Sequence, residues 1–310
     1  MKVNIEPSPL HAPAARLGCL RFLLTATRPR EWIKNTFMFA PLFFSQNALN
    51  PELVLKTAYG FALFCVAAAG VYLINDIIDR EDDRLHPDKK KRPVAAGVLS
   101  VRFAAIAAGF LITVAVVGSF DLGSNFGLVT VAYVTLVAAY SKWLKHLVIV
   151  DVFAIAAGFV LRVAAGAVAI DVVMSHWLVI CTMLLALFLG LSKRRQELVT
   201  LASDGKLHRQ VLAEYNSLFL DMMIGVVTSA TVVSYALYTV SQETVQRFHT
   251  DRLLYTLPFV LYGIFRYLYL VYHKNHGGDP SRTLVSDGPL LTNIVLWVLT
   301  CGIIIYAANY

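Results

Sequence analysis

Hydrophobic residues follow one another along this chain in nine long runs, which short polar stretches separate. A helix that crosses a bilayer core of roughly 30 Å needs about 20 mostly apolar residues. The pattern therefore predicts an all-α integral membrane protein with nine transmembrane helices. Their approximate ranges are 28–45, 52–78, 99–120, 126–140, 147–170, 177–191, 218–240, 253–272 and 284–306.

Composition agrees with a location inside a membrane. Of the 310 residues, 57% are hydrophobic and only 15% are charged, and the mean hydropathy is +0.63. These values exclude an ordinary soluble domain. Residues 1–27 are mixed in character and lack the long apolar core of a signal peptide, so we expect a cytoplasmic N-terminal arm there. Residues 28–310 are expected to form one nine-helix transmembrane domain.

The positive charges predict how the chain is oriented. The net charge is +7, but the lysines and arginines are spread over several loops, which argues against nucleic acid as a partner. Most lie in the N-terminal arm or in the loops after the second, fourth, sixth and eighth spans. Lys56, near the start of the second span, and Arg247 and Arg252 fall on the other side. The positive-inside rule then predicts a multi-pass protein of the cell inner (plasma) membrane with a cytoplasmic N terminus.

An acidic motif ends the second span, in the sequence NDIIDREDD that begins at Asn75. In a helix, Asp76, Asp79 and Asp83 are spaced i, i+3 and i+7 and share one face, with Asn75 at its edge. Carboxylates stacked in this way repel one another unless a cation lies between them, and such oxygen ligands suit Mg²⁺. We therefore interpret these four residues as magnesium ligands that open toward the cytoplasm.

A block of cations follows the acidic motif and includes Arg84, Lys89 and Arg92. Carboxylates that hold a metal ion beside cations are typical of a site for a diphosphate group. The alternative is a solvated loop whose charges only fix the orientation in the membrane. The sequence leaves both interpretations of the basic block open.

Another cation, Arg162, lies well inside the fifth span. An unpaired charge there costs about 3 kcal/mol on an insertion scale, so Arg162 is expected to face the bundle interior with an acidic or phosphate partner. Asp151 lies three turns earlier on a similar face and could join the same cavity. Lys193 and Glu197 are spaced i and i+4 after the sixth span, which also suits a surface pair. Small residues near Arg162 predict close helix packing: Gly158, Ala164, Ala165 and Gly166.

Taken together, these segments resemble the UbiA superfamily of membrane prenyltransferases. The resemblance is carried by NDxxDxxxD on the second span, followed by HP and RP, within nine predicted spans. Within the superfamily the chain most resembles the decaprenyl-phosphate phosphoribosyltransferase (DPPR synthase) branch. The supporting segments are RPREWIKNTFMFAPLFF, DREDDRLHPDKKKRP, AYSKWLKHLVIVD, GFVLRVAAGAVA, LSKRRQEL and DPSRTLVSDGPLL.

The resemblance implies a function. It is the Mg²⁺-dependent transfer of a 5-phosphoribosyl group from phosphoribosyl diphosphate to a polyprenyl (decaprenyl) phosphate, with release of diphosphate, in the synthesis of cell-envelope arabinan precursors. Asp76, Asp79 and Asp83 would be the catalytic residues, the partners would be the two substrates and the membrane, and a homo-oligomer is compatible with the family. The substrate-binding residues would be Lys34, Asn75, Arg84, Lys89, Arg92, Tyr140, Lys145, Arg162, Lys193, Arg194 and Glu197.

The stretch after the sixth span departs from the general pattern of the superfamily. Members that act on aromatic acceptors carry a second aspartate-rich motif there, whereas this chain offers Glu197 and Asp204 among several cations. The cations suit substrates with additional phosphate groups. One alternative is a prenyltransferase that moves a prenyl group from a prenyl diphosphate to an aromatic or other acceptor. Another is a lipid or solute transporter, although the acids cluster at one mouth and not at the midplane.

Overall fold

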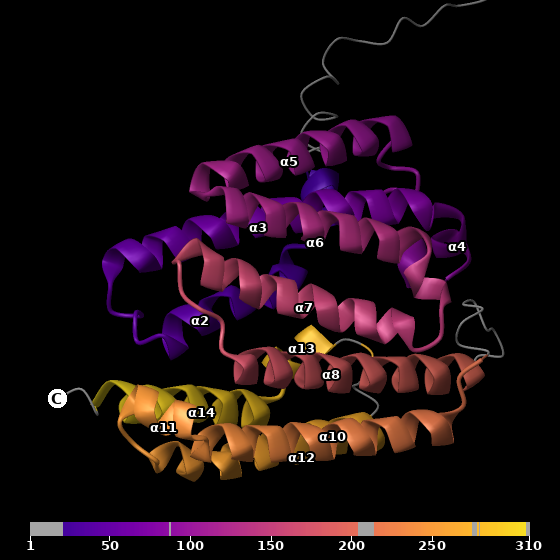
Figure 1. Ribbon diagram of the computed structural model, residues 1–310. Coiled ribbons are helices and arrows are strands. Elements are labelled where there is room, and N and C mark those ends of the chain that lie inside the picture. The colour runs from indigo at the N-terminus through magenta and orange to yellow at the C-terminus, as the bar shows by residue number, and fades with distance from the viewer. Residues whose placement is uncertain (1–20, 87, 204–213, 275–277, 279, 308–310) are drawn as a thin grey trace, which may run out of the picture.

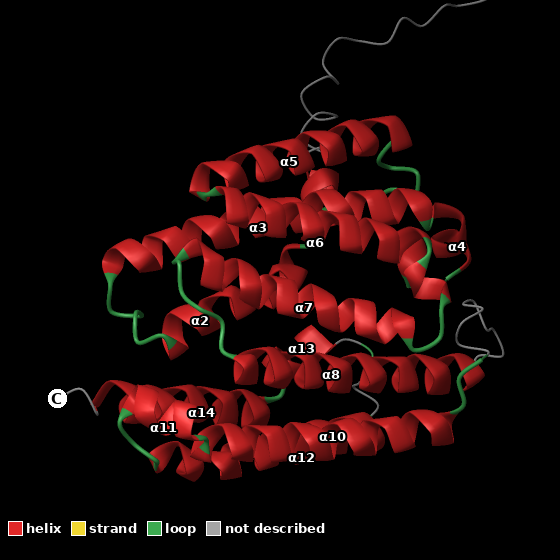
Figure 2. Cartoon of the chain, in the orientation of Figure 1, coloured by secondary structure: helices red, strands yellow, loops and turns green. Residues whose placement is uncertain are grey.

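The computed structural model describes residues 21–86, 88–203, 214–274, 278 and 280–307, and among these residues it contains helices and loops but no strand (Figure 2). Eight of the helices are long and apolar enough to cross a membrane, which confirms the prediction of an all-α, multi-pass membrane protein. They are Pro51–Ile78 (α3), Val101–Leu122 (α5), Ser124–Lys142 (α6), Val150–Ala169 (α7), His176–Ser203 (α8), Ser217–Val240 (α10), Leu257–His273 (α12, extended by the 3₁₀ turn Arg252–Thr256) and Gly288–Ala307 (α14).

The first predicted span is not one continuous α-helix. Pro29–Met38 forms a 3₁₀ helix, and Phe39–Phe44 forms a short α-helix (α2). Pro41 has no N–H to donate to the carbonyl of Phe37, and its ring crowds that carbonyl, which accounts for the change of helix type in this region. Within the described residues, eight helices are long and apolar enough to span a membrane, whereas the hydrophobic pattern predicted nine spans.

The helix that carries the acidic motif begins at a strong start signal. The Asn50 side-chain oxygen accepts hydrogen bonds from the backbone N–H groups of Glu52 at 3.1 Å and Leu53 at 3.4 Å. Pro51 occupies the first helical position, where its missing N–H costs nothing. From this start α3 runs for 28 residues and presents the acidic motif at its other end.

The long helices lie side by side in one bundle (Figure 1). Neighbours in contact include α3 with α5, α6 with α7, α7 with α8, α8 with α10, and α12 with α14. The short helix Arg80–Leu85 (α4) lies at one end of the bundle, whereas α2 and Gln242–Phe248 (α11) lie toward the opposite end. The short helix Pro280–Ser286 (α13) contacts α14 and the 3₁₀ helix of the first segment.

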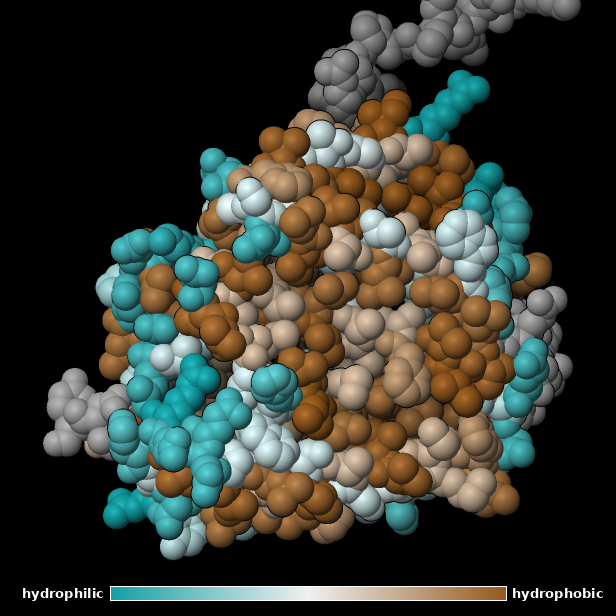
Figure 3. All heavy atoms as spheres, in the orientation of Figure 1, coloured by the Kyte–Doolittle hydropathy of each residue, from teal (hydrophilic) through white to brown (hydrophobic). Residues whose placement is uncertain are grey.

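The outer surface of the bundle is apolar across its middle. Figure 3 shows hydrophobic residues covering the centre of one face, with hydrophilic residues gathered toward its two ends. Exposed side chains on the long helices include Ile106 at 72%, Phe110 at 68% and Val226 at 64%. A soluble monomer rarely exposes so large an apolar area, so this surface fits contact with lipid.

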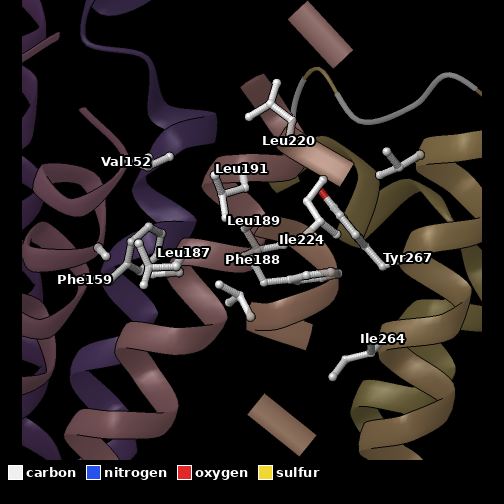
Figure 4. Packing of buried hydrophobic residues seen from close by; sticks show 14 of the residues in the cluster. Val152, Phe159, Leu187, Phe188, Leu189, Leu191, Leu220, Ile224, Ile264 and Tyr267 are labelled. Carbon is white, nitrogen blue, oxygen red and sulfur yellow. The ribbon is translucent and has the colours of Figure 1, made fainter. Parts of the chain in front are cut away.

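Inside the bundle, buried apolar side chains join the helices. Phe188 and Tyr267 contribute to a cluster that joins α8 and α12 to α7 and α10 (Figure 4). At Gly166 on α7, an added Cβ atom would lie 2.0 Å from the carbonyl oxygen of Met38. Only glycine allows α7 to approach the first segment this closely, which confirms the predicted close packing at this position.

Residues 21–26, in the predicted N-terminal arm, are helical. Ala26 is 1% exposed and belongs to the same buried cluster as Leu73 of α3. The rest of the arm, up to residue 20, lies outside the described residues. The division into an arm and one transmembrane domain remains a prediction.

Candidate active site

The three aspartates of the acidic motif are buried where α3 passes into α4. Their exposed fractions are 1% for Asp76, 9% for Asp79 and 3% for Asp83. Although α3 ends just before Asp79, the Asp79 N–H donates to the Asn75 carbonyl at 2.9 Å and the Asp83 N–H donates to the Asp79 carbonyl at 2.8 Å. The helical hydrogen-bond pattern therefore continues through the motif and keeps its carboxylates together.

Arginines from two other segments pair with these carboxylates. Arg92 Nη1 lies 2.6 Å from Asp83 Oδ2 and 3.3 Å from Asp76 Oδ1, so one guanidinium joins two acids. Arg28 forms a further ion pair with Asp76. The basic loop therefore folds back onto the acidic motif, and Arg92 does not belong to a purely solvated loop.

Asp79 is held from two sides. The Lys145 ammonium group, on the 3₁₀ turn Leu144–His146, forms an ion pair with Asp79 Oδ1 although Lys145 is only 7% exposed. The Asn75 side-chain amide donates to Asp79 Oδ2 at 3.1 Å. The loop after α6 therefore completes a cluster that begins on α3.

The donor atoms of this cluster fit Mg²⁺. Asp76 Oδ2 is buried and has no hydrogen-bond partner among the described residues, which is costly for a desolvated acceptor. Carboxylate and amide oxygens are the ligands that Mg²⁺ prefers. Within the described ranges no three potential ligands are already gathered into a metal site, because cations lie between the carboxylates. A magnesium ion would have to displace some of these cations.

A cavity of about 1020 Å³ begins beside the cluster and runs through the bundle to Trp297 and Glu243 near the opposite end. Asp76, Asp83 and Lys145 do not line it, but they contact residues that do. The predicted site residues that line it are Lys34, Asn75, Asp79, Lys89, Arg92, Tyr140, Arg162, Lys193, Arg194 and Glu197.

Arg84 lies apart from the other predicted site residues. It does not line the cavity, and its Nε donates to the Ala95 carbonyl at 3.1 Å. Its Nη1 is 3.0 Å from a carboxylate oxygen of Glu81. In this geometry Arg84 holds the basic loop outside the cavity, and its role in binding substrate stays a prediction.

Arg194 is buried and neutralised by carboxylates. Its Nε donates to Asp151 at 2.6 Å, its Nη1 to Glu197 at 2.6 Å, and its Nη2 to the Tyr140 hydroxyl at 2.9 Å. The Tyr215 hydroxyl donates to the other Asp151 oxygen at 2.9 Å. Burial raises the pKa of Tyr215 to about 12, so the phenol remains a donor near neutral pH. This network fixes Arg194 in place at the cavity wall.

Arg162 faces the bundle interior, as predicted, but its partners are neutral. Its Nε donates to the Asn35 side-chain oxygen at 2.8 Å, its Nη2 to the Tyr133 hydroxyl at 2.9 Å, and its Nη1 to the Gly158 carbonyl at 2.8 Å. The acidic partner that the sequence suggested is not found among the described residues. Its positive charge is therefore not paired with a carboxylate of the described residues.

Several residues of the site escaped the sequence analysis as site residues. They are Arg28, Asn35, Tyr133 and Tyr215. A polar amide such as Asn35 within an apolar run was a usable signal, because buried polar groups need partners. The contacts of Arg28 and Tyr215 depend on distant segments and left no local signal.

Comparison with known proteins agrees with this geometry. Residues 36–286 match the model of the UbiA prenyltransferase family. The chain belongs to the UbiA prenyltransferase family. It is 32% identical to the decaprenyl-phosphate phosphoribosyltransferase of Mycolicibacterium smegmatis over 97% of each chain. It is also 32% identical to the protein of the same name from Corynebacterium glutamicum, over 92% of this chain and 86% of that relative.

Solved UbiA structures share this fold. The structure of a UbiA homologue from Archaeoglobus fulgidus bound to GPP and Mg²⁺ superposes with a TM-score of 0.70 at 17% identity, covering 92% of this chain and 99% of that one. The predicted resemblance to the UbiA superfamily and its phosphoribosyltransferase branch is confirmed, and so is the prediction that this UbiA protein is a transferase enzyme.

Proposed function

We propose that this UbiA protein transfers a 5-phosphoribosyl group from phosphoribosyl diphosphate to a polyprenyl phosphate such as decaprenyl phosphate, and releases diphosphate. The observation that supports this most is the distribution of charge along one cavity. Buried carboxylates gather at its mouth, and deeper in the cavity an arginine, Arg162, carries an uncompensated charge. Two substrates that both carry phosphate fit this arrangement. The names of the relatives support the same reaction.

The acidic motif would hold the metal ion. Asn75, Asp76, Asp79 and Asp83 are the candidate ligands, and Mg²⁺ would supply neutralisation of the charge on the leaving diphosphate. Arg92 and the cavity-lining lysines Lys89 and Lys193 would bind phosphate groups. Lys145, Arg194 and Glu197 would position these groups through the contacts described above, and Tyr140 and Lys34 would border the substrates.

The reaction needs little proton transfer. An oxygen of the polyprenyl phosphate attacks C1 of the ribose and forms a new C–O bond, while the bond from C1 to the diphosphate oxygen breaks and the electron pair leaves with diphosphate. The attacking phosphate oxygen is ionised near neutral pH, so no strong general base is required. The contribution of the protein is to align the two substrates and to stabilise the departing negative charge.

The same proposal includes the position in the cell. The segment Pro29–Phe44 would be a further crossing, in addition to the eight spanning helices, with residues 1–27 as a cytoplasmic arm and residues 28–310 as the catalytic domain. The mouth of the cavity would open to the cytoplasm of a plasma membrane, where phosphoribosyl diphosphate is dissolved. The product would serve the synthesis of cell-envelope arabinan precursors.

The decisive experiment follows label from donor to lipid. Purified protein is incubated with ribose-labelled phosphoribosyl diphosphate, decaprenyl phosphate and Mg²⁺, and the lipid extract is counted, with EDTA as the control. We expect label in the lipid that disappears with EDTA. Absence of label with folded protein would contradict the proposal, and the next assay would then be prenyl transfer from prenyl diphosphates to aromatic acceptors.

A further inference from the structure

The arginines of the cavity differ in how their charge is compensated. Arg28 and Arg92 pair with Asp76, and Arg194 pairs with two carboxylates. Arg162 donates only to neutral oxygens, and no carboxylate pairs with it in the ranges that the structure describes. Arg162 is thus a positive charge that faces the cavity without an anion.

The surroundings of Arg162 make this charge costly. The residue is 6% exposed and lies within the spanning helix α7, where a buried charge without a counter-charge costs several kcal/mol. Its guanidinium carbon lies 4.8 Å from the centre of the Tyr133 ring and 5.2 Å from that of Phe159. Such contacts offset a part of the cost but leave the net charge unchanged. An anion bound in the cavity would remove the rest of this cost.

The guanidinium also has donors to spare. It carries five N–H groups, and three of them are used by Asn35, Tyr133 and Gly158. One N–H remains on each terminal nitrogen, and Arg162 lines the cavity. These N–H groups can donate to the oxygens of a phosphate.

This position is separate from the acidic motif. Asn35, which accepts from Arg162, also donates to Cys65 Sγ of α3 at 3.3 Å, and Cys65 lies 11 residues before Asp76 of the acidic motif, which is about 16 Å along the helix. The wall beside Arg162 is aromatic, with the Phe37 and Phe159 rings packed edge to face at 5.1 Å. A phosphate that carries an apolar chain suits such a place better than a fully hydrated anion.

We propose that Arg162, held in place by Asn35 and Tyr133, binds the phosphate of the lipid acceptor, at a place distinct from the diphosphate site of the acidic motif. This inference rests on the proposed phosphoribosyl transfer and names the residue that receives its lipid substrate. Asn35 and Tyr133 act as positioning residues, because they orient the guanidinium without cancelling its charge.

The sharpest test adds a negative charge beside Arg162 and keeps the shape of the side chain at position 35. Asn35→Asp places a carboxylate where the Arg162 Nε now donates to an amide oxygen, so the new ion pair would cancel the charge that the ligand needs. The probe is farnesyl phosphate, compared with the uncharged farnesol and, separately, with phosphoribosyl diphosphate plus Mg²⁺. Binding of each is measured alone by calorimetry in detergent. Asn293→Asp is the matched control, since Asn293 also lines the cavity but contacts the Phe259 carbonyl.

We expect Asn35→Asp and Arg162→Gln each to weaken farnesyl phosphate binding at least tenfold. The affinity for farnesol and for phosphoribosyl diphosphate should stay within about twofold of the wild-type value, as should all affinities of Asn293→Asp. If Arg162→Gln fails to fold, Arg162→Lys replaces it, and a melting curve accompanies every variant. A lysine keeps the charge but loses the paired donors, so we expect an intermediate affinity.

Two results would overturn this inference. One is a folded Asn35→Asp variant that binds farnesyl phosphate as well as the wild type does. The other is a loss confined to phosphoribosyl diphosphate, which would assign Arg162 to a phosphate of the donor. Failure of the proposed function would give a different result. In that case farnesyl phosphate would still bind in a way that depends on Arg162, but no label would reach the lipid. That result would refute the reaction and would still support the lipid phosphate site.

Discussion

Single side chains decide how the cavity is charged. Asp79 and Lys145 neutralise each other at its mouth, and Arg194 is neutralised by two carboxylates further along the wall. Arg162 donates hydrogen bonds to neutral side chains. Helical spacing within one segment was enough to predict the aspartates of the acidic motif as a group. The partner of Arg162 was not predictable, because Asn35 lies 127 positions away in the sequence.

Replacement of Asp79 tests the metal site. In Asp79→Asn the amide keeps the shape but supplies no negative charge for a metal ion, so we expect transfer to fall at least a hundredfold. The melting temperature should also fall, because buried Lys145 loses its counter-charge, so activity is compared per folded molecule. The matched control is Asp82→Asn, since Asp82 is exposed on the neighbouring helix α4. Full activity of Asp79→Asn would remove Asp79 from the metal site.

The Tyr215 hydroxyl provides a test of the network that holds Arg194. It donates to Asp151, accepts the Ile149 N–H at 2.6 Å, and does not line the cavity. Tyr215→Phe should destabilise the protein by about 1–3 kcal/mol, because buried polar groups lose their partner. Thermal unfolding in detergent measures the loss. Activity per folded molecule should also fall, because the Tyr215 hydroxyl helps Asp151 to hold Arg194. Tyr255→Phe, on an exposed ring, should leave both quantities as they are.

At the scale of elements, the first segment shows what the hydrophobic pattern could and could not predict. The first segment was predicted as one helix from its apolar run, yet it changes from 3₁₀ to α-helix at Phe39. Hydropathy reports whether a segment prefers lipid and says little about helix type, which Pro41 influences through backbone sterics. Small residues around Arg162 correctly indicated a tight contact, but they did not name Met38 as its partner.

Two glycines make this contact testable. Gly166→Ala adds a Cβ that would overlap the Met38 carbonyl, so α7 and the first segment must separate, at a cost of about 1–3 kcal/mol. We expect a lower melting temperature and weaker activity. Gly109→Ala is the control, because nothing lies within 4 Å of a Cβ at that position of α5, and alanine favours a helix by up to about 1 kcal/mol over glycine. Equal melting temperatures for the two variants would contradict the close approach.

At the scale of the whole molecule, the arrangement of helices sets the ends of the cavity. Figure 1 places α4 at one end of the bundle and α2 and α11 toward the other. The carboxylates and their cations lie at the α4 end, whereas Trp297 and Glu243 line the far part of the cavity. The cavity therefore has its buried carboxylates at one end, while apolar side chains together with Arg162, Glu243 and Arg247 line the rest of it.

The number of crossings is testable with reporter fusions. Nine crossings with a cytoplasmic N terminus place a reporter fused after Tyr310 outside the cytoplasm, so alkaline phosphatase should be active there and green fluorescent protein dark. Fusions after Lys274, beyond the preceding span, should give the opposite pattern and serve as the control. Eight crossings with the same N-terminal orientation would reverse the result at Tyr310.

The sequence by itself determined the membrane class, eight of its nine predicted spanning segments and the acidic motif, because run length and helical spacing are local properties of the chain. Only the tertiary structure decided which cations reach which acids. Lys145 meets Asp79 across 66 positions and Arg162 meets Asn35 across 127. Pairing at such separations depends on how the helices pack, and no local pattern encodes it. The uncompensated charge of Arg162 is therefore a property of the folded molecule.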